Sequence, residues 1–223
     1  MRVLIATGGE CHLTGAFAAA LKEFDPELTI AADAGLEYIW QLGMQPDILL
    51  GDMDSLGEEK LGEARAKGLM PRLFSSHKDQ TDTELALSAA LELAGPEAAI
   101  RVIGAGGGRT DHTYANLLLL SRYRHQAEFW DAYSRIRMIR GPKRLEVEKP
   151  CWMRADRTVY YSFLPFGTGI SGLSLQGFEY PLQGASLQAD AVIGISNQLA
   201  PGCERGVVTL ESGLLLCMAS QEA

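Results

Sequence analysis

Short apolar runs alternate with segments of helical character over roughly the first 140 residues. The runs typical of strands lie at residues 2–6, 28–31, 48–50, 69–74, 99–103 and 128–131. The segments typical of helices lie between them, at residues 14–24, 36–42, 58–67, 81–93 and 111–122. Alternation of this kind predicts an α/β domain in which a parallel sheet is flanked by helices on both faces.

The segment at residues 81–93 is the clearest helix of this region. It opens with Thr81 and Glu84 in the spacing of a capping box, and it ends before Gly95-Pro96. A threonine followed three residues later by a glutamate satisfies two free N–H groups at a helix start. We therefore expect this helix to begin at or directly after Thr81.

After about residue 140 the helical spacing fades and short strands separated by glycines take its place. These strands are expected at residues 144–148, 158–164, 173–175, 187–193, 207–210 and 214–218. Many short strands with turn signals between them predict a small all-β sandwich. We place the domain boundary at Gly141-Pro142, which gives an α/β domain at residues 1–140 and a β-sandwich at 141–223.

The charge and the cysteines narrow the class of function. The chain of 223 residues has a formal net charge of −8, which disfavours nucleic acid and anionic membranes as partners. No apolar run approaches the roughly 18 residues that a membrane span needs. The four cysteines are far apart and form no C-x-x-C pair, so we expect no zinc site, four free thiols and a cytoplasmic protein.

Carboxylates follow four of the expected strands in the first domain. They are Asp33 after residues 28–31, Asp52 and Asp54 after 48–50, Asp79 and Asp82 after 69–74, and Asp111 after 99–103. The carboxyl ends of parallel strands share one edge of the sheet, where ligands of open α/β sheets bind. Any single aspartate could instead be a helix cap or a turn former.

Asp52 and Asp54 are the most informative of these acids. Two carboxylates two residues apart on a short turn repel one another unless a cation lies between them. Mg²⁺ prefers oxygen ligands and is commonly held by one or two carboxylates together with phosphate oxygens. The pair therefore favours a magnesium site, whereas Asp82 could act only on the dipole of its own helix.

A glycine-rich loop at residues 104–108 lies between an expected strand and an expected helix. Gly106 and Gly107 would let backbone N–H groups approach a phosphate, and Arg109 would add a forked cation. The alternative is a flexible turn, because neither G-x-G-x-x-G nor G-x-x-x-x-G-K-[ST] is present. Lys78 could reach a phosphate or be a surface charge, and His112 could cap its helix or contact a ligand.

The order of these motifs resembles thiamine pyrophosphokinase over nearly the whole chain. The matching motifs are Ala32-Asp33-Ala34-Gly35, Gly51-Asp52-Met53-Asp54-Ser55, Lys78-Asp79-Gln80-Thr81-Asp82, Gly108-Arg109-Thr110-Asp111-His112, Ser196-Asn197 and Glu211-Ser212-Gly213. The resemblance implies a homodimer with active sites between subunits. It implies an enzyme that transfers pyrophosphate from ATP to the hydroxyl of thiamine, giving thiamine diphosphate and AMP.

The resemblance also implies roles for individual residues. Asp52, Asp54 and Asp82 would bind Mg²⁺ and the ATP phosphates, and Asp79 would join them in catalysis. The ATP site would comprise Asp33, Lys78, Gly106, Gly107, Arg109, Asp111 and His112. Ser196 and Asn197 would contact thiamine. Some family members carry a tryptophan shortly after Ser-Asn, where this chain has Gln198-Leu199-Ala200, so the aromatic side chain that stacks on thiamine is not identified by the motif.

Two other functions suit the same pattern of acids and glycines. A magnesium-dependent phosphohydrolase would release free phosphate instead of AMP and a diphosphorylated alcohol. A non-catalytic nucleotide sensor, with the β domain as its output, would bind ATP without turnover.

Overall fold

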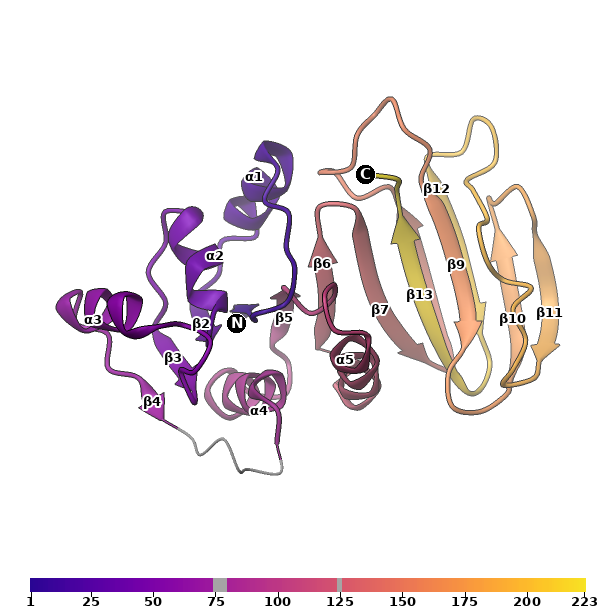
Figure 1. Cartoon of the computed structure of the whole chain (residues 1–223). Helices are drawn as coiled ribbons and strands as arrows, with labels where there is room; N and C mark the ends of the chain where they lie inside the picture. Colours follow the sequence, from indigo (N-terminus) through magenta and orange to yellow (C-terminus); the bar gives the residue numbers. More distant parts are fainter. Residues whose placement is uncertain (74–79, 124–125) are drawn as a thin grey trace. The chain divides into compact units, whose positions relative to one another are not determined.

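The computed structural model describes residues 1–73, 80–123 and 126–223 and divides into two compact units, Met1–Ala132 and Tyr133–Ala223 (Figure 1). The division precedes the Gly141-Pro142 boundary expected from the sequence because strand β7 (Ser134–Arg140) pairs with the last strand of the chain. The sequence analysis missed β7, in which arginines alternate with apolar residues and mask its strand character.

The first unit contains a parallel sheet, as predicted. Its strands are β1 (Arg2–Ala6), β2 (Leu28–Ala32), β3 (Ile48–Gly51), β4 (Arg72–Leu73), β5 (Ala99–Ile103) and β6 (Ala127–Asp131). They lie in the order β4-β3-β2-β1-β5-β6, and every pair of neighbours is parallel. Strands β1, β2 and β3 are buried almost throughout, which explains their continuous apolar sequences.

Helices connect these strands and cover the sheet. They are α1 (Gly15–Glu23), α2 (Gly35–Gln41), α3 (Glu58–Ala66), α4 (Asp82–Ala94) and α5 (Thr110–Arg122). The chain runs outward from β1 to β4 and then from β5 to β6 in the opposite direction. Right-handed crossovers therefore place α1–α3 on one face and α4 and α5 on the other (Figure 1). The order reverses between β1 and β5, where open sheets of this type bind ligands.

Helix α4 starts as the capping box predicts. The hydroxyl of Thr81 accepts a hydrogen bond from the backbone N–H of Glu84 at 3.2 Å, and Asp82 is the first helical residue. Gly95, with φ of 79°, ends the helix in a conformation that suits glycine. Helix α4 packs against β1, β2 and β3 of the sheet. The local sequence, by setting where α4 begins, thus also sets the position of Asp82 at the edge of that sheet.

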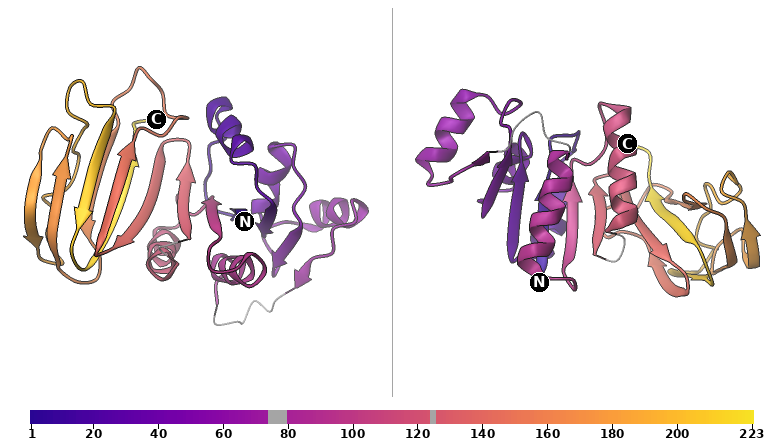
Figure 2. Two further views of the ribbon diagram at one scale, coloured as in Figure 1. Left: turned by 180° about the vertical axis from the view of Figure 1, so that it is seen from behind. Right: turned by 90° about the horizontal axis from the view of Figure 1, so that it is seen from below.

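The second unit consists of antiparallel strands in two sheets. Their strands are β7, β8 (Lys143–Glu148), β9 (Tyr160–Pro165), β10 (Ile170–Gln176), β11 (Leu182–Leu187), β12 (Arg205–Leu210) and β13 (Leu214–Ser220). One sheet has the order β7-β13-β9 and the other β11-β10-β12-β8. Val147 of β8 lines the same pocket as Tyr161 of β9 and Cys217 of β13, so the two sheets face one another as a sandwich (Figure 2).

The strand expected at residues 187–193 is wrong in its extent. β11 ends at Leu187, and residues 188–193 form turns, with the N–H of Ala191 bonded to the carbonyl of Gln188. Val192 and Ile193 are 67% and 66% exposed, although an apolar run in a sandwich strand would be half buried. Apolar character alone therefore misled the strand assignment here.

The helices and the cysteines bear on two further expectations. In the described residues, the helices are too short or too polar to cross a membrane. All four cysteines are free, as predicted: Cys217 is buried, Cys11 is half-buried, and Cys151 and Cys203 are exposed.

Candidate active site

Four of the predicted acids gather at the carboxyl edge of the parallel sheet. Asp33 follows β2, Asp52 and Asp54 follow β3, and Asp82 opens α4. Asp82 lies close enough to raise the pKa of Asp33, and Asp52 close enough to raise that of Asp54. The charge of Asp52 also acts on Asp33, and that of Asp82 acts on Asp54. The structure thus brings together acids that are distant in the sequence.

Asp33 is the most constrained member of this cluster. Its side chain is buried, and its φ of 47° is in the left-handed region that few non-glycine residues adopt. Its Oδ1 accepts a hydrogen bond from the N–H of Met53 at 3.0 Å, which ties the β2 and β3 loops together. Gly51 makes this possible, because a Cβ there would stand 1.9 Å from that oxygen. Strain of this kind concentrates at functional sites.

The electrostatics of the cluster follow from its crowding. Burial, followed by the hydrogen bond to Asp82, raises the pKa of Asp33 to about 7. The hydrogen bond to Asp52 and the negative charge of Asp52 raise the pKa of the exposed Asp54 carboxyl. The cluster therefore takes up protons when nothing else offsets its negative charge, and a cation would replace them.

The acids suit a metal ion by their donor atoms and charge, although their side chains are not arranged around a common point. In the described residues no three His, Cys, Asp or Glu side chains are grouped as a ready metal site. The acids are instead linked in two pairs, Asp33 with Asp82 and Asp52 with Asp54. Carboxylate oxygens are the donors that Mg²⁺ prefers. The raised pKa values of Asp33 and Asp54 show that negative charge is in excess. Lys78 and Asp79, predicted for the same edge, lie outside the described residues.

The glycine-rich loop after β5 is interlocked with the loop after β1, at the point where the strand order reverses. The N–H of Gly9 bonds to the carbonyl of Gly104 at 2.9 Å, and the N–H of Glu10 bonds to that of Gly106 at 3.0 Å. A Cβ on Gly107 would stand 2.4 Å from the Cβ of Glu10. Gly106 is half-buried and Gly107 is exposed. The loop is thus a packed backbone structure rather than a free turn.

Arg109 and Asp111 form a forked ion pair at the start of α5. The Nε and Nη2 atoms of Arg109 donate to the two oxygens of Asp111 at 3.2 and 2.6 Å. This pair lowers the pKa of Asp111 to about 2, although both side chains are largely exposed. His112 is exposed, and its backbone N–H also donates to Asp111. The arginine is therefore held at the helix start, where an anion would meet it.

Ser196 and Asn197 lie in the second unit and differ from each other. Ser196 is exposed with φ of 58°. Asn197 is buried, and its Oδ1 accepts the N–H of Tyr180 at 3.0 Å while its Nδ2 donates to the carbonyl of Tyr180 at 2.8 Å. Tyr180 itself is 64% exposed. The sequence analysis missed Tyr180, because the long-range contact with Asn197 leaves no mark in local sequence.

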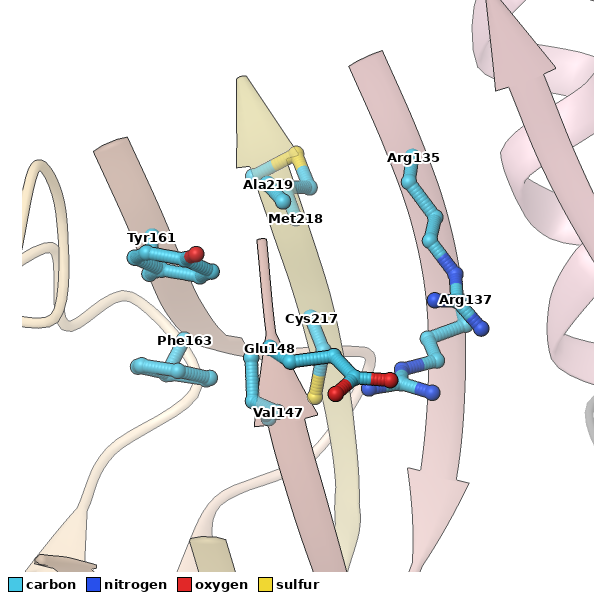
Figure 3. Close-up of a pocket in the computed structure, with 9 residues that line it drawn as sticks. All are labelled: Arg135, Arg137, Val147, Glu148, Tyr161, Phe163, Cys217, Met218 and Ala219. Atoms are coloured by element: carbon cyan, nitrogen blue, oxygen red, sulfur yellow. The ribbon is translucent and has the colours of Figure 1, made fainter. Parts of the chain in front are cut away.

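A pocket in the second unit contains none of the predicted site residues. It lies between the two sheets and includes Tyr161, Phe163, Cys217, Arg135, Arg137 and Glu148 (Figure 3). The buried hydroxyl of Tyr161 has no hydrogen-bond partner in the part of the chain that the structure describes. Burial raises its pKa to about 12, so it stays a neutral phenol. The backbone of Tyr161 pairs with that of Asn197, with N···O distances of 2.7 and 2.8 Å.

Comparison with known families divides the chain as the structure does. Residues 23–130 match the family model "Thiamin pyrophosphokinase, catalytic domain", and residues 152–215 match "Thiamin pyrophosphokinase, vitamin B1 binding domain". The first match covers the unit that carries the acidic cluster, and the second covers most of the β-sandwich. No support comes from these matches for the phosphohydrolase or the sensor.

Individual relatives match most or all of the chain. The thiamine pyrophosphokinase of Bacillus subtilis is 31% identical over 198 residues, which cover 87% of this chain and 88% of that protein. Its crystal structure has a TM-score of 0.84 at 30% identity and full coverage of both chains. That of Geobacillus thermodenitrificans has a TM-score of 0.81 at 27% identity and covers 100% of this chain and 99% of its own. The chain belongs to the thiamine pyrophosphokinase family.

Proposed function

We propose that the chain transfers the pyrophosphate group of ATP to the hydroxyl of thiamine, giving thiamine diphosphate and AMP. The observation that carries the proposal is the acidic cluster of Asp33, Asp52, Asp54 and Asp82, at the same sheet edge as the glycine loop. Phosphoryl-type transfer needs positioning and charge neutralisation more than covalent catalysis. Membership of the thiamine pyrophosphokinase family supplies the identity of the two substrates.

Mg²⁺ is the proposed metal, held by Asp52, Asp54 and Asp82. Support comes from their oxygen donors and from the excess negative charge that raises the pKa values of Asp33 and Asp54. When bound, the ion would offset charge on the phosphate oxygens. Asp33 orients the Asp52–Asp54 turn through its bond to the N–H of Met53. Asp79 is proposed as a further catalytic residue from the motif alone.

The ATP phosphates are proposed to bind along the edge that carries Gly106, Gly107 and Arg109. Glycine N–H groups, a guanidinium and a helix start are each suited to anions, and all three occur within residues 106–110. Asp111 holds the guanidinium in place through both of its oxygens. Asp33, Asp111 and His112 complete the proposed ATP site, together with Lys78.

Thiamine is proposed to bind at Ser196 and Asn197, with Tyr180 as the aromatic surface. The side-chain amide of Asn197 already bonds to the N–H and the carbonyl of Tyr180. Asn197 therefore positions Tyr180 rather than binding thiamine directly. The exposed ring of Tyr180 offers a face on which an aromatic heterocycle can stack. The exposed hydroxyl of Ser196 can donate or accept a hydrogen bond. This arrangement supplies the stacking group that Gln198-Leu199-Ala200 does not.

A homodimer in the cytoplasm is the proposed working state. Val192, Ile193 and Ile195 expose 67%, 66% and 59% of their surface in one short segment, which suits burial against a second copy. The free and exposed thiols of Cys151 and Cys203 suit a reducing compartment.

The direct test of this proposal is thiamine-dependent formation of AMP from MgATP. The parent chain should form AMP only when thiamine is present, and Asp52→Asn should nearly abolish the reaction because an amide is a poor Mg²⁺ ligand. Asp156→Asn is the matched control, since Asp156 is an exposed carboxylate paired with Arg154 in the other unit. Phosphate release without thiamine would favour a hydrolase, and ATP binding without turnover would favour a sensor.

A further inference from the structure

The backbone of the glycine loop is fixed by three consecutive carbonyl groups. The carbonyl of Gly104 accepts hydrogen bonds from the N–H of Gly9 at 2.9 Å and from the hydroxyl of Thr7 at 2.6 Å. The carbonyl of Gly106 accepts from the N–H of Glu10 at 3.0 Å. The carbonyl between them, of Ala105, accepts from the side chain of Asn116 at 2.8 Å.

These bonds determine where the N–H groups of the loop point. In a planar trans peptide, the N–H of one residue points opposite to the carbonyl of the residue before it. With the carbonyls of residues 104–106 held by protein groups, the N–H groups of residues 105–107 are directed away from those groups. A backbone N–H that points away from the group holding its own peptide's carbonyl can donate to an anion.

Asn116 is the only side chain that holds the central peptide among the described contacts of this loop. Its amide is buried, a little under two turns after α5 begins at Thr110. Gly106 accepts either orientation of the Ala105–Gly106 peptide, because glycine has no Cβ to disfavour one of them. The bond from Asn116 therefore selects the orientation of that peptide.

We propose that Asn116 is a positioning residue for ATP, which orients the N–H of Gly106 toward the phosphates by holding the carbonyl of Ala105. The inference rests on the proposed function in that ATP is the nucleotide bound at this loop. It assigns a role to a residue of α5 that lies outside every sequence motif considered above. Asn116 does not touch ATP in this scheme; it acts through the loop.

The test compares Asn116→Leu, which removes the donor at similar volume, with Gln221→Leu. Gln221 is also a buried amide, and it bonds to the carbonyls of Arg154 and Arg157 in the second unit. Asn116→Leu should weaken MgATP binding in calorimetry and raise the KM for ATP by about tenfold, the factor for one hydrogen bond of ordinary strength. The KM for thiamine should stay within about twofold, and Gln221→Leu should leave both KM values unchanged within that range.

Hydrogen exchange adds a readout that does not depend on turnover. The amides of residues 105–107 should exchange faster in Asn116→Leu, while those of β5 should keep their parental rates. A folded Asn116→Leu chain that binds MgATP as the parent does would overturn the inference, and so would an equal rise in both KM values. A parent chain that binds MgATP but forms no AMP would contradict the proposed function instead, while the calorimetric comparison would still decide the role of Asn116.

Discussion

At the scale of single residues, the acidic cluster depends on one position without a side chain. Gly51 has φ of 137° and leaves room for the carboxylate of Asp33, which reaches across to the N–H of Met53. The same contact orders the turn that carries Asp52 and Asp54. A glycine therefore controls the geometry of Asp33, Asp52 and Asp54, through a contact that the sequence pattern does not reveal.

Gly51→Ala should destabilise the fold by about 1–3 kcal/mol, because the new methyl group would overlap the Asp33 carboxylate. Thiamine-dependent turnover should fall with it. Gly62→Ala is the matched control, since Gly62 lies inside α3 with open space around its Cβ position. That change should stabilise by about 0.5–1 kcal/mol. Urea unfolding of both variants measures the difference, and equal stabilities would contradict the role assigned to Gly51.

Asp33→Asn should raise the Tm in EDTA at pH 8 by about 2–4 °C, the shift that corresponds to about 1 kcal/mol in a domain of this size. The pKa of Asp33 is raised from 3.8 to about 7 in the folded state, so folded chains bind more protons than unfolded ones between these values. Stability then falls as pH rises from about 4 to 7 and is lowest above 7. Asparagine removes the buried charge and keeps the acceptor for Met53.

The gain from Asp33→Asn should shrink at pH 5, where the folded parent already holds the proton. Calorimetric scans at the two pH values check this sign. A gain that is larger at pH 5 than at pH 8 would show that burial of the Asp33 charge is not the cause.

At the scale of elements, the side chain of Asn197 holds the backbone of Tyr180, in a segment that backbone bonds also tie to residues 198–200. Asn197 bonds to the N–H and the carbonyl of Tyr180, and its own backbone pairs with Tyr161 of β9. Through Asn197 and Tyr161, the backbone of Tyr180 is linked by hydrogen bonds to the core of the sandwich. In this core the ring centroids of Phe163 and Phe178 lie 5.1 Å apart.

Asn197→Ala should raise the KM for thiamine and leave that for ATP almost unchanged, because it releases the backbone of Tyr180 in the second unit. The loss of the buried hydrogen bonds should also cost about 1–3 kcal/mol of stability. Steady-state kinetics with each substrate varied in turn measure the first effect. A rise confined to the KM for ATP would refute the assignment of thiamine to this segment.

Regular elements were predicted best from the sequence where periodicity and capping agree. Helix α4 and strands β1, β2, β3 and β5 appear within one residue of their expected limits at most ends, because buried parallel strands and capped helices carry strong local signals. β7 was missed and residues 188–193 were assigned wrongly, because pairing and burial there depend on distant strands.

For the candidate site, too, some features could be predicted from the sequence and others could not. Clustering of acids followed from the rule that parallel strands end at one edge. The roles of Gly51, Asn116 and Tyr180 did not, since each depends on a contact with residues 17 or more positions away or on a backbone turn whose shape only the fold sets.

At the scale of the whole molecule, the residues proposed to bind ATP and those proposed to bind thiamine lie in different units. The first unit carries the acids and the glycine loop, and the second carries Ser196, Asn197 and Tyr180. The two family models match the units in the same order. The second unit also carries the exposed apolar segment on which the proposed homodimer rests.

The exposed apolar segment of Val192, Ile193 and Ile195 should be buried in that dimer. Ile193→Asp should shift the mass measured by light scattering from a dimer toward a monomer, because a charge in an apolar interface is costly. Ala223→Asp is the matched control, because it adds the same charge at the exposed last residue of the chain and should leave the mass unchanged. A parent chain that is monomeric and fully active would rule out the proposed dimer.

The central claim is that the pyrophosphate group moves from ATP to thiamine as a unit. Incubation of the chain with thiamine, Mg²⁺ and ATP labelled separately at the β or the γ phosphate tests this most directly. Attack at the β-phosphorus predicts that both labels appear in thiamine diphosphate, in equal yield, with unlabelled AMP as the other product. Label from the γ position alone in a thiamine product, with ADP formed, would contradict the claim, and so would label recovered only as inorganic phosphate.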